Sequence, residues 1–271
     1  CGIVGYVGYR EAYPIIIKGL KRLEYRGYDS SGVALLDDGD VKLSKTKGKV
    51  VDLERKAQTE ISQSGTLGIG HTRWATHGVP NDTNSHPHFS QSGQLAIVHN
   101  GIIENHQKLK EQLKLNGVIF KSDTDTEIIP NLLSLNIHQE TGLKDAIVKT
   151  VSKLSGQYSF IAMLKDETLV GVKNHEPLIL GIGQNGCFLS SDVLGFAKHV
   201  EKIIYLDDKQ FVVVNHQGYD IYDFEGNLLN LIPIKLTGNF ENVEKGNYDH
   251  FTIKEIHEQT TSIIESGIPS L

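Results

Sequence analysis

The chain contains little cysteine and methionine. Its 271 residues include two cysteines, Cys1 and Cys187, and one methionine, Met163. It has neither a paired cysteine framework nor an HExxH pattern, so it gives no support for a structural zinc site or a zinc protease site. We therefore expect free thiols in a reducing cytosol, a cytoplasmic location, and no metal or other cofactor. Because Cys1 stands first and no methionine precedes it, we expect a processed form.

Long apolar segments and an excess of positive charge are also missing. The run Pro14-Ile15-Ile16-Ile17 is far shorter than the ~20 residues of a membrane helix, which argues against a membrane protein. The net charge is −6 and the lysines and arginines are scattered, which argues against a nucleic-acid partner. A chain of this length can bury roughly three quarters of its unfolded surface, enough for one large domain or two smaller ones.

Hydrophobic periodicity predicts a mixture of helices and strands. In the first part of the chain we expect strands at 2–8, 32–36, 41–46, 66–73 and 94–99, and helices at 10–24, 50–62, 105–116, 126–138 and 143–154. From residue 157 we expect strands alone, at 158–164, 168–173, 177–182, 186–190, 202–206, 211–216 and 219–223. Close spacing without intervening helices favours antiparallel pairing, so the predicted class is α+β.

The last part of the chain differs from the rest. Residues 239–248 are polar and resemble a linker, and residues 252–264 have the periodicity of an amphipathic helix. We predict one domain over residues 1–240, followed at 241–271 by a linker and the start of a further domain.

Residue 1 carries both a thiol and a free α-amine. The α-amine has an ordinary pKa of ~7.7–8, well below the ~10.4 of lysine, so it is partly neutral at pH 7. It can accept the thiol proton directly or through one water, which makes Cys1 a candidate nucleophile with its own general base. The alternative is a cysteine exposed incidentally by removal of a methionine.

Two motifs offer what such a nucleophile requires. Residues 70–78 place Arg73 among hydroxyl and imidazole groups, which suits a small carboxylate, although a surface arginine is the alternative. The second motif, His99-Asn100-Gly101, follows an apolar strand. Asn-Gly is first of all a turn signal. The Asn100 amide and the Gly101 N–H can also form an oxyanion hole.

Other motifs have structural interpretations. Thr124 and Glu127 predict a capping box at the start of a helix, which would place Asp125 in its first turn, facing a ligand amine. Residues 181–186 match the dinucleotide fingerprint formally, but a strand follows them, so we interpret them as a hairpin turn. The several histidines of residues 71–99 lack the spacing of a metal site.

Together these motifs resemble the glutaminase domains of the glucosamine-6-phosphate synthases, which are glutamine amidotransferases with an N-terminal cysteine. The resemblance covers residues 1 to about 240, and residues 248–259 look like the entry to the sugar-isomerase domain of that family. The stretches that carry it are residues 1–5, 24–32, 70–78, 86–88, 99–105 and 124–127. It implies the N-terminal-nucleophile hydrolase fold, a four-layer αββα sandwich with two antiparallel sheets.

The resemblance also implies roles for individual residues. Cys1 would attack the side-chain amide of glutamine and form a γ-glutamyl thioester, with its α-amine as the base. Asn100 and Gly101 would stabilise the oxyanion. The other implied residues are Arg73 for the α-carboxylate, Asp125 for the α-ammonium, Thr76 and His77 in the same pocket, Trp74 as a gate for ammonia, and Arg26 and His86 as structural support.

We therefore expect hydrolysis of L-glutamine to glutamate and ammonia. By resemblance, the ammonia would serve the conversion of fructose 6-phosphate to glucosamine 6-phosphate by a sugar-isomerase domain outside this chain, in an enzyme that is a homo-oligomer at full length. One alternative is the glutaminase domain of an amidotransferase with another acceptor. The other is a glutamine-binding regulatory module without turnover.

Overall fold

The computed structural model describes residues 1–237 of the chain. The predicted domain boundary at residue 240, the linker at 239–248, the helix at 252–264 and the stretch 248–259 lie outside the described residues.

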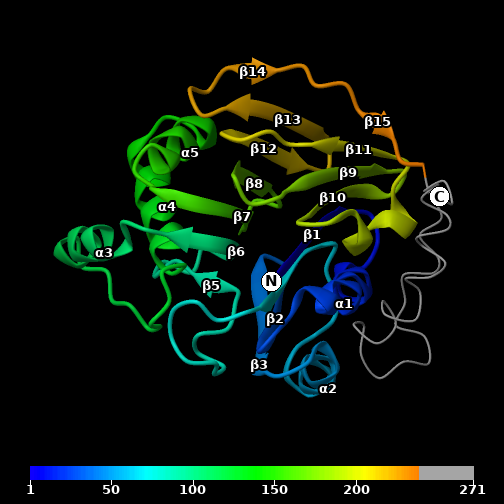
Figure 1. The fold of residues 1–271 in the computed structure, drawn as a ribbon, viewed down its shortest axis with the longest axis horizontal. Helices are drawn as coiled ribbons and strands as arrows, with labels where there is room; N and C mark the ends of the chain where they lie inside the picture. The colour runs from blue at the N-terminus through cyan, green and yellow to red at the C-terminus, as the bar shows by residue number, and fades with distance from the viewer. Residues whose placement is uncertain (238–271) are drawn as a thin grey trace, which may run out of the picture. The chain divides into compact units, whose positions relative to one another are not determined.

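Two antiparallel sheets form the centre of the described fold (Figure 1). The first has the strand order β15-β11-β9-β10-β1-β4-β2-β3 and the second the order β14-β13-β12-β8-β7-β6-β5. The strands of the first sheet are β1 (Gly2–Gly8), β2 (Ser30–Asp37), β3 (Asp40–Lys47), β4 (Leu67–Arg73), β9 (Ile179–Gly183), β10 (Gly186–Ser190), β11 (Lys202–Tyr205) and β15 (Ile234–Lys235). Those of the second are β5 (His88–Phe89), β6 (Leu95–Ile103), β7 (Gly156–Leu164), β8 (Leu169–Asn174), β12 (Gln210–Asn215), β13 (Gly218–Asp223) and β14 (Leu228–Leu229).

Helices cover the outer face of each sheet (Figure 1). The first sheet packs against α1 (Ala12–Leu23) and α2 (Val50–Glu60), and the second against α3 (His106–Leu115), α4 (Ile128–Gln139) and α5 (Leu143–Val151). Short 3-10 turns lie at residues 24–26, 193–195 and 197–199. None of the helices within residues 1–237 has the length and apolar character needed to cross a membrane.

Alternating side chains of the central strands produce the layers. In β1, Ile3 and Val7 enter the core between the two sheets, whereas Val4 and Tyr6 pack on the helical side. Successive side chains of a strand point to opposite faces, so a strand that is apolar throughout must be covered on both faces. The predicted α+β class and the αββα layer order are confirmed.

The elements predicted within residues 1–237 are all present, with boundaries shifted by a few residues. The largest shift affects β6, which continues to Ile103 and pairs along its whole length with β7. Asn100 and Gly101 therefore lie inside a strand, opposite Ser159 and Tyr158, and the turn interpretation of Asn-Gly is wrong. The hairpin interpretation of residues 181–186 is confirmed, since Gly183 pairs with Gly186 across a two-residue turn.

The predicted capping box at α4 is wrong. The helix begins at Ile128, and the residue before it, Glu127, makes no capping hydrogen bond with its side chain. The Glu127 carboxylate instead accepts hydrogen bonds from the backbone N–H groups of Lys121 and Ser122, at 2.7–3.1 Å. The Glu127 carboxylate is therefore bound to the preceding loop and not to the start of the helix. Asp125 lies in a turn ahead of the helix rather than in its first turn.

Candidate active site

The candidate site lies where β1 begins and β4 ends, beside the second half of β6. In the first sheet Gly2 is paired with Thr72, which brings Cys1 next to Arg73. A cavity of about 530 Å³ opens at this place. Its lining residues are Cys1, Arg26, His71, Arg73, Trp74, Thr76, His86, His99, Asn100, Gly101, Ile102, Glu104, Thr124, Asp125, Thr126, Gln157 and Glu176. Of the residues predicted from the sequence, His77 is absent from this lining.

Hydrogen bonds fix Cys1 on both sides of its α-carbon. Its Sγ accepts a hydrogen bond from the Trp74 backbone N–H at 3.0 Å and lies 3.6 Å from the Trp74 carbonyl oxygen, to which the thiol donates. Its carbonyl oxygen accepts from Arg26 Nε at 2.7 Å. The Arg26 guanidinium also lies 3.8 Å from the Asp192 carboxylate, which holds it in place. Arg26 is thus in position to support the N-terminus, as expected from the sequence.

The environment of the Cys1 α-amine suits a general base. Burial, and next the positive charge of Arg26, lower the pKa of this amine to about 6, while the carboxylates of Glu176 and Asp29 act in the opposite direction. At pH 7 the amine is therefore mostly neutral and able to take a proton.

Cys187 has a different environment. It pairs with Val7 at the far end of β1, roughly 20 Å from Cys1 at the usual rise of a strand, so the two cysteines cannot form a disulfide. Burial raises the pKa of its thiol to about 11, which keeps it protonated and unreactive at neutral pH.

Asn100 presents a free donor beside Cys1. Its Oδ1 lies 2.9 Å from His71 Nε2, while its Nδ2 is buried without a hydrogen-bond partner among the described residues. A buried donor left unpaired costs about 1–3 kcal/mol, so such a group points to a ligand that accepts from it. Gly101 follows with φ of +97°, and a Cβ there would come within 2.1 Å of the Gln157 carbonyl oxygen.

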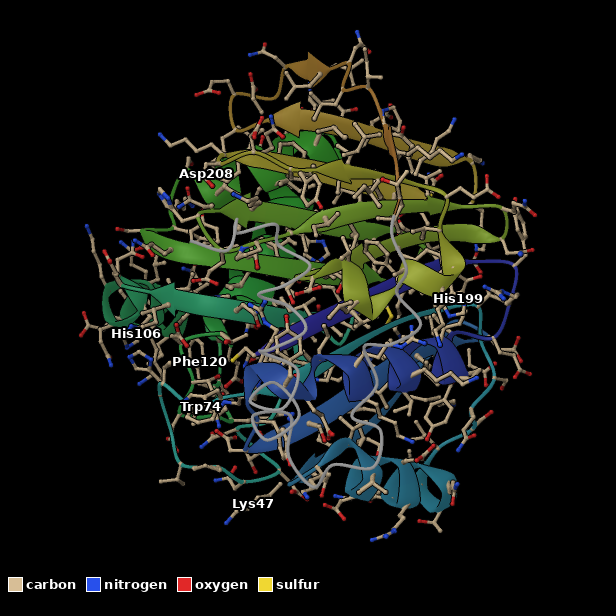
Figure 2. The ribbon with its side chains drawn as sticks, turned by 45° about the vertical axis from the view of Figure 1, so that its right-hand side comes forward. Lys47, Trp74, His106, Phe120, His199 and Asp208 are labelled. Carbon is tan, nitrogen blue, oxygen red and sulfur yellow. The ribbon has the colours of Figure 1, made fainter. Side chains whose placement is uncertain are left out.

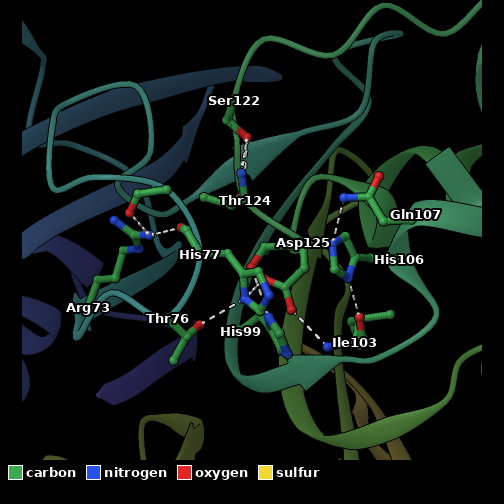
Figure 3. Close-up of polar contacts among 12 residues, drawn as sticks. Arg73, Thr76, His77, His99, Ile103, His106, Gln107, Ser122, Thr124 and Asp125 are labelled. Atoms are coloured by element: carbon green, nitrogen blue, oxygen red, sulfur yellow. Dashed lines mark hydrogen bonds and ion pairs between the residues drawn. The ribbon is translucent and has the colours of Figure 1, made fainter.

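Arg73 and Asp125 place opposite charges in the cavity. Arg73 is 4% exposed, and its Nη2 donates to the carbonyl oxygens of His77 and Gly78. Its Nη1 has no hydrogen-bond partner among the described residues. Asp125 Oδ2 accepts from the Ile103 N–H at 2.7 Å, and Oδ1 lies 3.9 Å from His77 Nδ1 (Figure 3). A free guanidinium edge and a carboxylate in one cavity are complementary to the two charged ends of an α-amino acid.

The remaining predicted residues lie at the edge of the cavity. Trp74, labelled in Figure 2, is a surface side chain, 60% exposed by its accessible area. Its ring lies so close to Gly27 that a Cβ there would come within 2.4 Å of it. Thr76 lines the cavity, and its hydroxyl is 3.3 Å from His77 Nδ1. His77 lies outside the lining but within 3.9 Å of Asp125 Oδ1. Its ring is T-shaped to the His106 ring, with 5.0 Å between the ring centroids.

Four buried histidines form a group behind the cavity. His71 stacks on His86 with 4.2 Å between ring centroids, and His88 and His99 lie around His86. Burial lowers the pKa of all four, so they are neutral at pH 7. Within residues 1–237, no group of three or more His, Cys, Asp or Glu side chains is arranged to hold a metal ion.

Several lining residues were not singled out from the sequence, among them His71, His99 and Glu176. The two histidines belong to quoted motifs, but their part depends on distant side chains: His71 bonds Asn100 of the other sheet, and His99 bonds Thr126 in the turn before α4. Glu176 has no local sequence signal at all.

Comparisons with known proteins agree with this geometry. The profile of the family described as glutamine amidotransferase domain matches residues 56–220. Glutamine–fructose-6-phosphate aminotransferases (isomerizing) from Clostridium acetobutylicum and from Aquifex aeolicus are each 46% identical over 97% of this chain. The chain spans 43% and 44% of the length of these two relatives.

Solved structures show the same fold. The glutamine phosphoribosylpyrophosphate amidotransferase of Bacillus subtilis, in complex with ADP and GMP, superposes with a TM-score of 0.73 at 26% identity, covering 84% of this chain and 50% of its own. A structure described as the allosteric regulatory enzyme of purine biosynthesis has a TM-score of 0.73 at 27% identity, covering 83% of this chain and 49% of its own. These neighbours confirm the predicted N-terminal-nucleophile fold, and the family profile confirms the resemblance found in the sequence. The chain belongs to the glutamine amidotransferase domain family.

Proposed function

We propose that this chain hydrolyses L-glutamine to glutamate and ammonia. The observation that carries the proposal is the cavity in which the Cys1 thiol, its weakly basic amine and the free Nδ2 of Asn100 meet a guanidinium and a carboxylate. Arg73 binds the α-carboxylate and Asp125 the α-ammonium. Together they present the side-chain amide of glutamine to Sγ, with Thr76 and His77 supporting Asp125.

The reaction begins when the α-amine takes the thiol proton. Sγ attacks the amide carbon, and the negative charge that develops on the carbonyl oxygen is stabilised by Asn100 Nδ2 and the Gly101 N–H. The C–N bond of the amide breaks as the protonated α-amine of Cys1 returns the proton to the leaving nitrogen. This step releases ammonia and leaves a γ-glutamyl thioester on Cys1. The neutral amine then activates a water, which releases glutamate and restores the thiol.

The relatives support a proposal for the use of the ammonia. Curated relatives that match 97% of the chain are named glutamine–fructose-6-phosphate aminotransferases, and the chain spans 43–44% of their length. We propose that residues 1–240 are the glutaminase domain of such an enzyme and that 241–271 lead into its sugar-isomerase part. The whole enzyme is then a cytoplasmic homo-oligomer that forms glucosamine 6-phosphate, with Trp74 at the exit of ammonia from the cavity.

A covalent label tests the glutaminase proposal. The untagged chain is incubated with 6-diazo-5-oxo-norleucine, and the adduct is mapped by mass spectrometry, with and without excess glutamine. We expect one adduct on Cys1 that glutamine prevents, and glutamate release that is lost in Cys1→Ala. An adduct on Cys187 that glutamine fails to prevent, or glutamate release that persists in Cys1→Ala, contradicts the proposal. Binding of glutamine without any turnover supports a regulatory module instead.

A further inference from the structure

The amide of Asn100 has two orientations of nearly equal shape and opposite effect. One presents Nδ2, a donor that stabilises a developing oxyanion, and the other presents Oδ1, an acceptor that repels it. An Asn side chain that is free to rotate would lose part of the stabilisation, so something must select the orientation.

His71 is placed to make that selection. Its Nε2 lies 2.9 Å from Asn100 Oδ1, and an amide oxygen can only accept, so Nε2 carries the hydrogen. Burial lowers the pKa of His71 to about 3, so the ring is neutral and has this single N–H. Its other nitrogen, Nδ1, is buried without a hydrogen-bond partner among residues 1–237. This agrees with a tautomer in which Nδ1 carries no hydrogen.

The flipped amide is the poorer arrangement. Asn100 Nδ2 would then donate to Nε2, and the hydrogen of His71 would move to Nδ1, where the described residues offer no acceptor. This orientation buries an unsatisfied donor permanently, at a cost of about 1–3 kcal/mol. The observed orientation leaves unpaired a donor that a substrate oxygen can satisfy.

The position of the His71 ring is fixed by the fold. His71 lies in β4 between Ile3 of β1 and Gly32 of β2, and its ring stacks on that of His86 with an angle of 16° between the planes. Asn100 belongs to β6 in the other sheet. The hydrogen bond therefore joins the two sheets at the cavity, and both partners stand on strands rather than on loops.

We infer that His71 is a positioning residue, whose Nε2–H holds Asn100 Oδ1 so that Nδ2 remains directed to the oxyanion. This inference rests on the proposed glutaminase reaction. It adds to that reaction a residue that acts through Asn100.

Two nearly isosteric variants isolate the hydrogen bond. His71→Gln keeps a donor near the position of Nε2, and His71→Met fills the same space without one. We expect His71→Met to lower kcat for glutamine by about 10- to 100-fold, by analogy with the loss of an outer-shell hydrogen bond that orients a metal ligand. We expect His71→Gln to retain most of the wild-type kcat, because its side-chain amide keeps an N–H donor for Asn100. KM should change little in either variant, because Arg73 and Asp125 hold the amino-acid end of glutamine. Equal kcat in the two variants, at equal melting temperature, contradicts the inference.

A double-mutant cycle separates positioning from general damage. Asn100→Ala removes the group that His71 orients, so His71→Met should have little further effect on kcat in that background. His88→Met is the matched control, since His88 is also buried against His86 but bonds to Thr124 and not to Asn100. Its effect on kcat should be the same in both backgrounds.

The outcomes distinguish the two proposals. A wild-type chain that hydrolyses glutamine, with equal His71→Met effects in both backgrounds, overturns the role of His71 and leaves the glutaminase proposal intact. A wild-type chain that hydrolyses no glutamine overturns both. A cycle in which His71→Met matters only when Asn100 is present supports both.

Discussion

At the scale of single residues, we expect the Cys1 α-amine to set the pH range of the proposed reaction. The amine acts as a base in its neutral form, and its pKa is lowered to about 6. We expect kcat/KM for glutamine to fall about tenfold per pH unit below pH 6 and to level off above it, because kcat/KM reports the free enzyme. In Arg26→Met the loss of a nearby positive charge favours the protonated amine, so the acidic limb should move to higher pH. Initial rates between pH 4.5 and 8.5 measure it.

Arg55→Met is the control for this prediction. Arg55 pairs with Asp52 on the surface of α2 and lies outside the cavity lining. The acidic limb of the kcat/KM profile of Arg55→Met should therefore coincide with that of the wild type. A limb that stays in place in Arg26→Met, or moves to lower pH, contradicts the assignment of the limb to the α-amine.

Asp125 offers a second test at this scale. Asp125→Asn keeps an oxygen for the Ile103 N–H but loses the negative charge that the proposal assigns to the α-ammonium. We expect KM for glutamine to rise by roughly 10- to 100-fold, the usual range for losing a charge-assisted hydrogen bond. The inhibition constant of 4-carbamoylbutanoate, which lacks the α-amino group, should be nearly equal in the wild type and in Asp125→Asn. An equal loss of affinity for both ligands points to a collapsed pocket instead.

Chemistry that resides within one residue could be predicted from the sequence. Cys1 carries its thiol and amine together, so its candidacy needed no structure. The oxyanion role of Asn100 could be offered only as one of two interpretations, since Asn-Gly also forms turns. The role proposed for His71 escaped prediction because it depends on an atom of another sheet, 29 residues along the chain.

At the scale of elements, the strand β6 depends on Gly101. This residue has φ of +97°, and a Cβ there would lie 2.1 Å from the Gln157 carbonyl oxygen of the neighbouring strand β7. Gly101→Ala should lower the free energy of unfolding by at least about 2 kcal/mol, through left-handed backbone strain and a steric collision. Urea denaturation followed by circular dichroism measures the change.

Gly117 provides the matched control. It also has a positive φ, +82°, but a Cβ there would meet nothing within 4 Å. Gly117→Ala should therefore report the backbone strain alone, about 1–2 kcal/mol. If the two variants lose the same stability, the collision with β7 contributes nothing.

Periodicity located the elements but missed the boundaries that matter for the site. A strand pattern ends in the sequence where apolar residues stop, yet β6 continues through the polar Asn100 because β7 pairs with it. The capping box failed because the Glu127 carboxylate has closer donors in the loop before it. Both errors arise from tertiary contacts that override a local preference.

At the scale of the whole molecule, the cavity belongs to neither sheet alone. Cys1 and Arg73 come from the first sheet, Asn100 from the second, and Asp125 from the turn ahead of α4. Composition and spacing gave the α+β class, but only the resemblance to a family implied the layer order and the convergence of these residues. A site assembled from distant segments needs the register of each strand, which no local pattern supplies.

The last prediction concerns which reaction this chain performs and which requires the part of its relatives that it does not span. The chain spans about 43% of the length of the curated relative from C. acetobutylicum, and every group that the proposed hydrolysis requires lies within residues 1–125. The chain alone should therefore release glutamate and ammonia in equal amounts, and fructose 6-phosphate should change neither rate.

A protein extended to the full length of those relatives should instead transfer the nitrogen to fructose 6-phosphate, and free ammonia should fall as glucosamine 6-phosphate forms. ¹⁵N-amide-labelled glutamine and mass spectrometry of the products follow the nitrogen in both proteins. Labelled glucosamine 6-phosphate from the 271-residue chain alone would place a sugar site within it. Transfer to a different acceptor by the extended protein would overturn the proposed acceptor but leave the glutaminase chemistry unchanged, because that chemistry depends on the cavity around Cys1 alone.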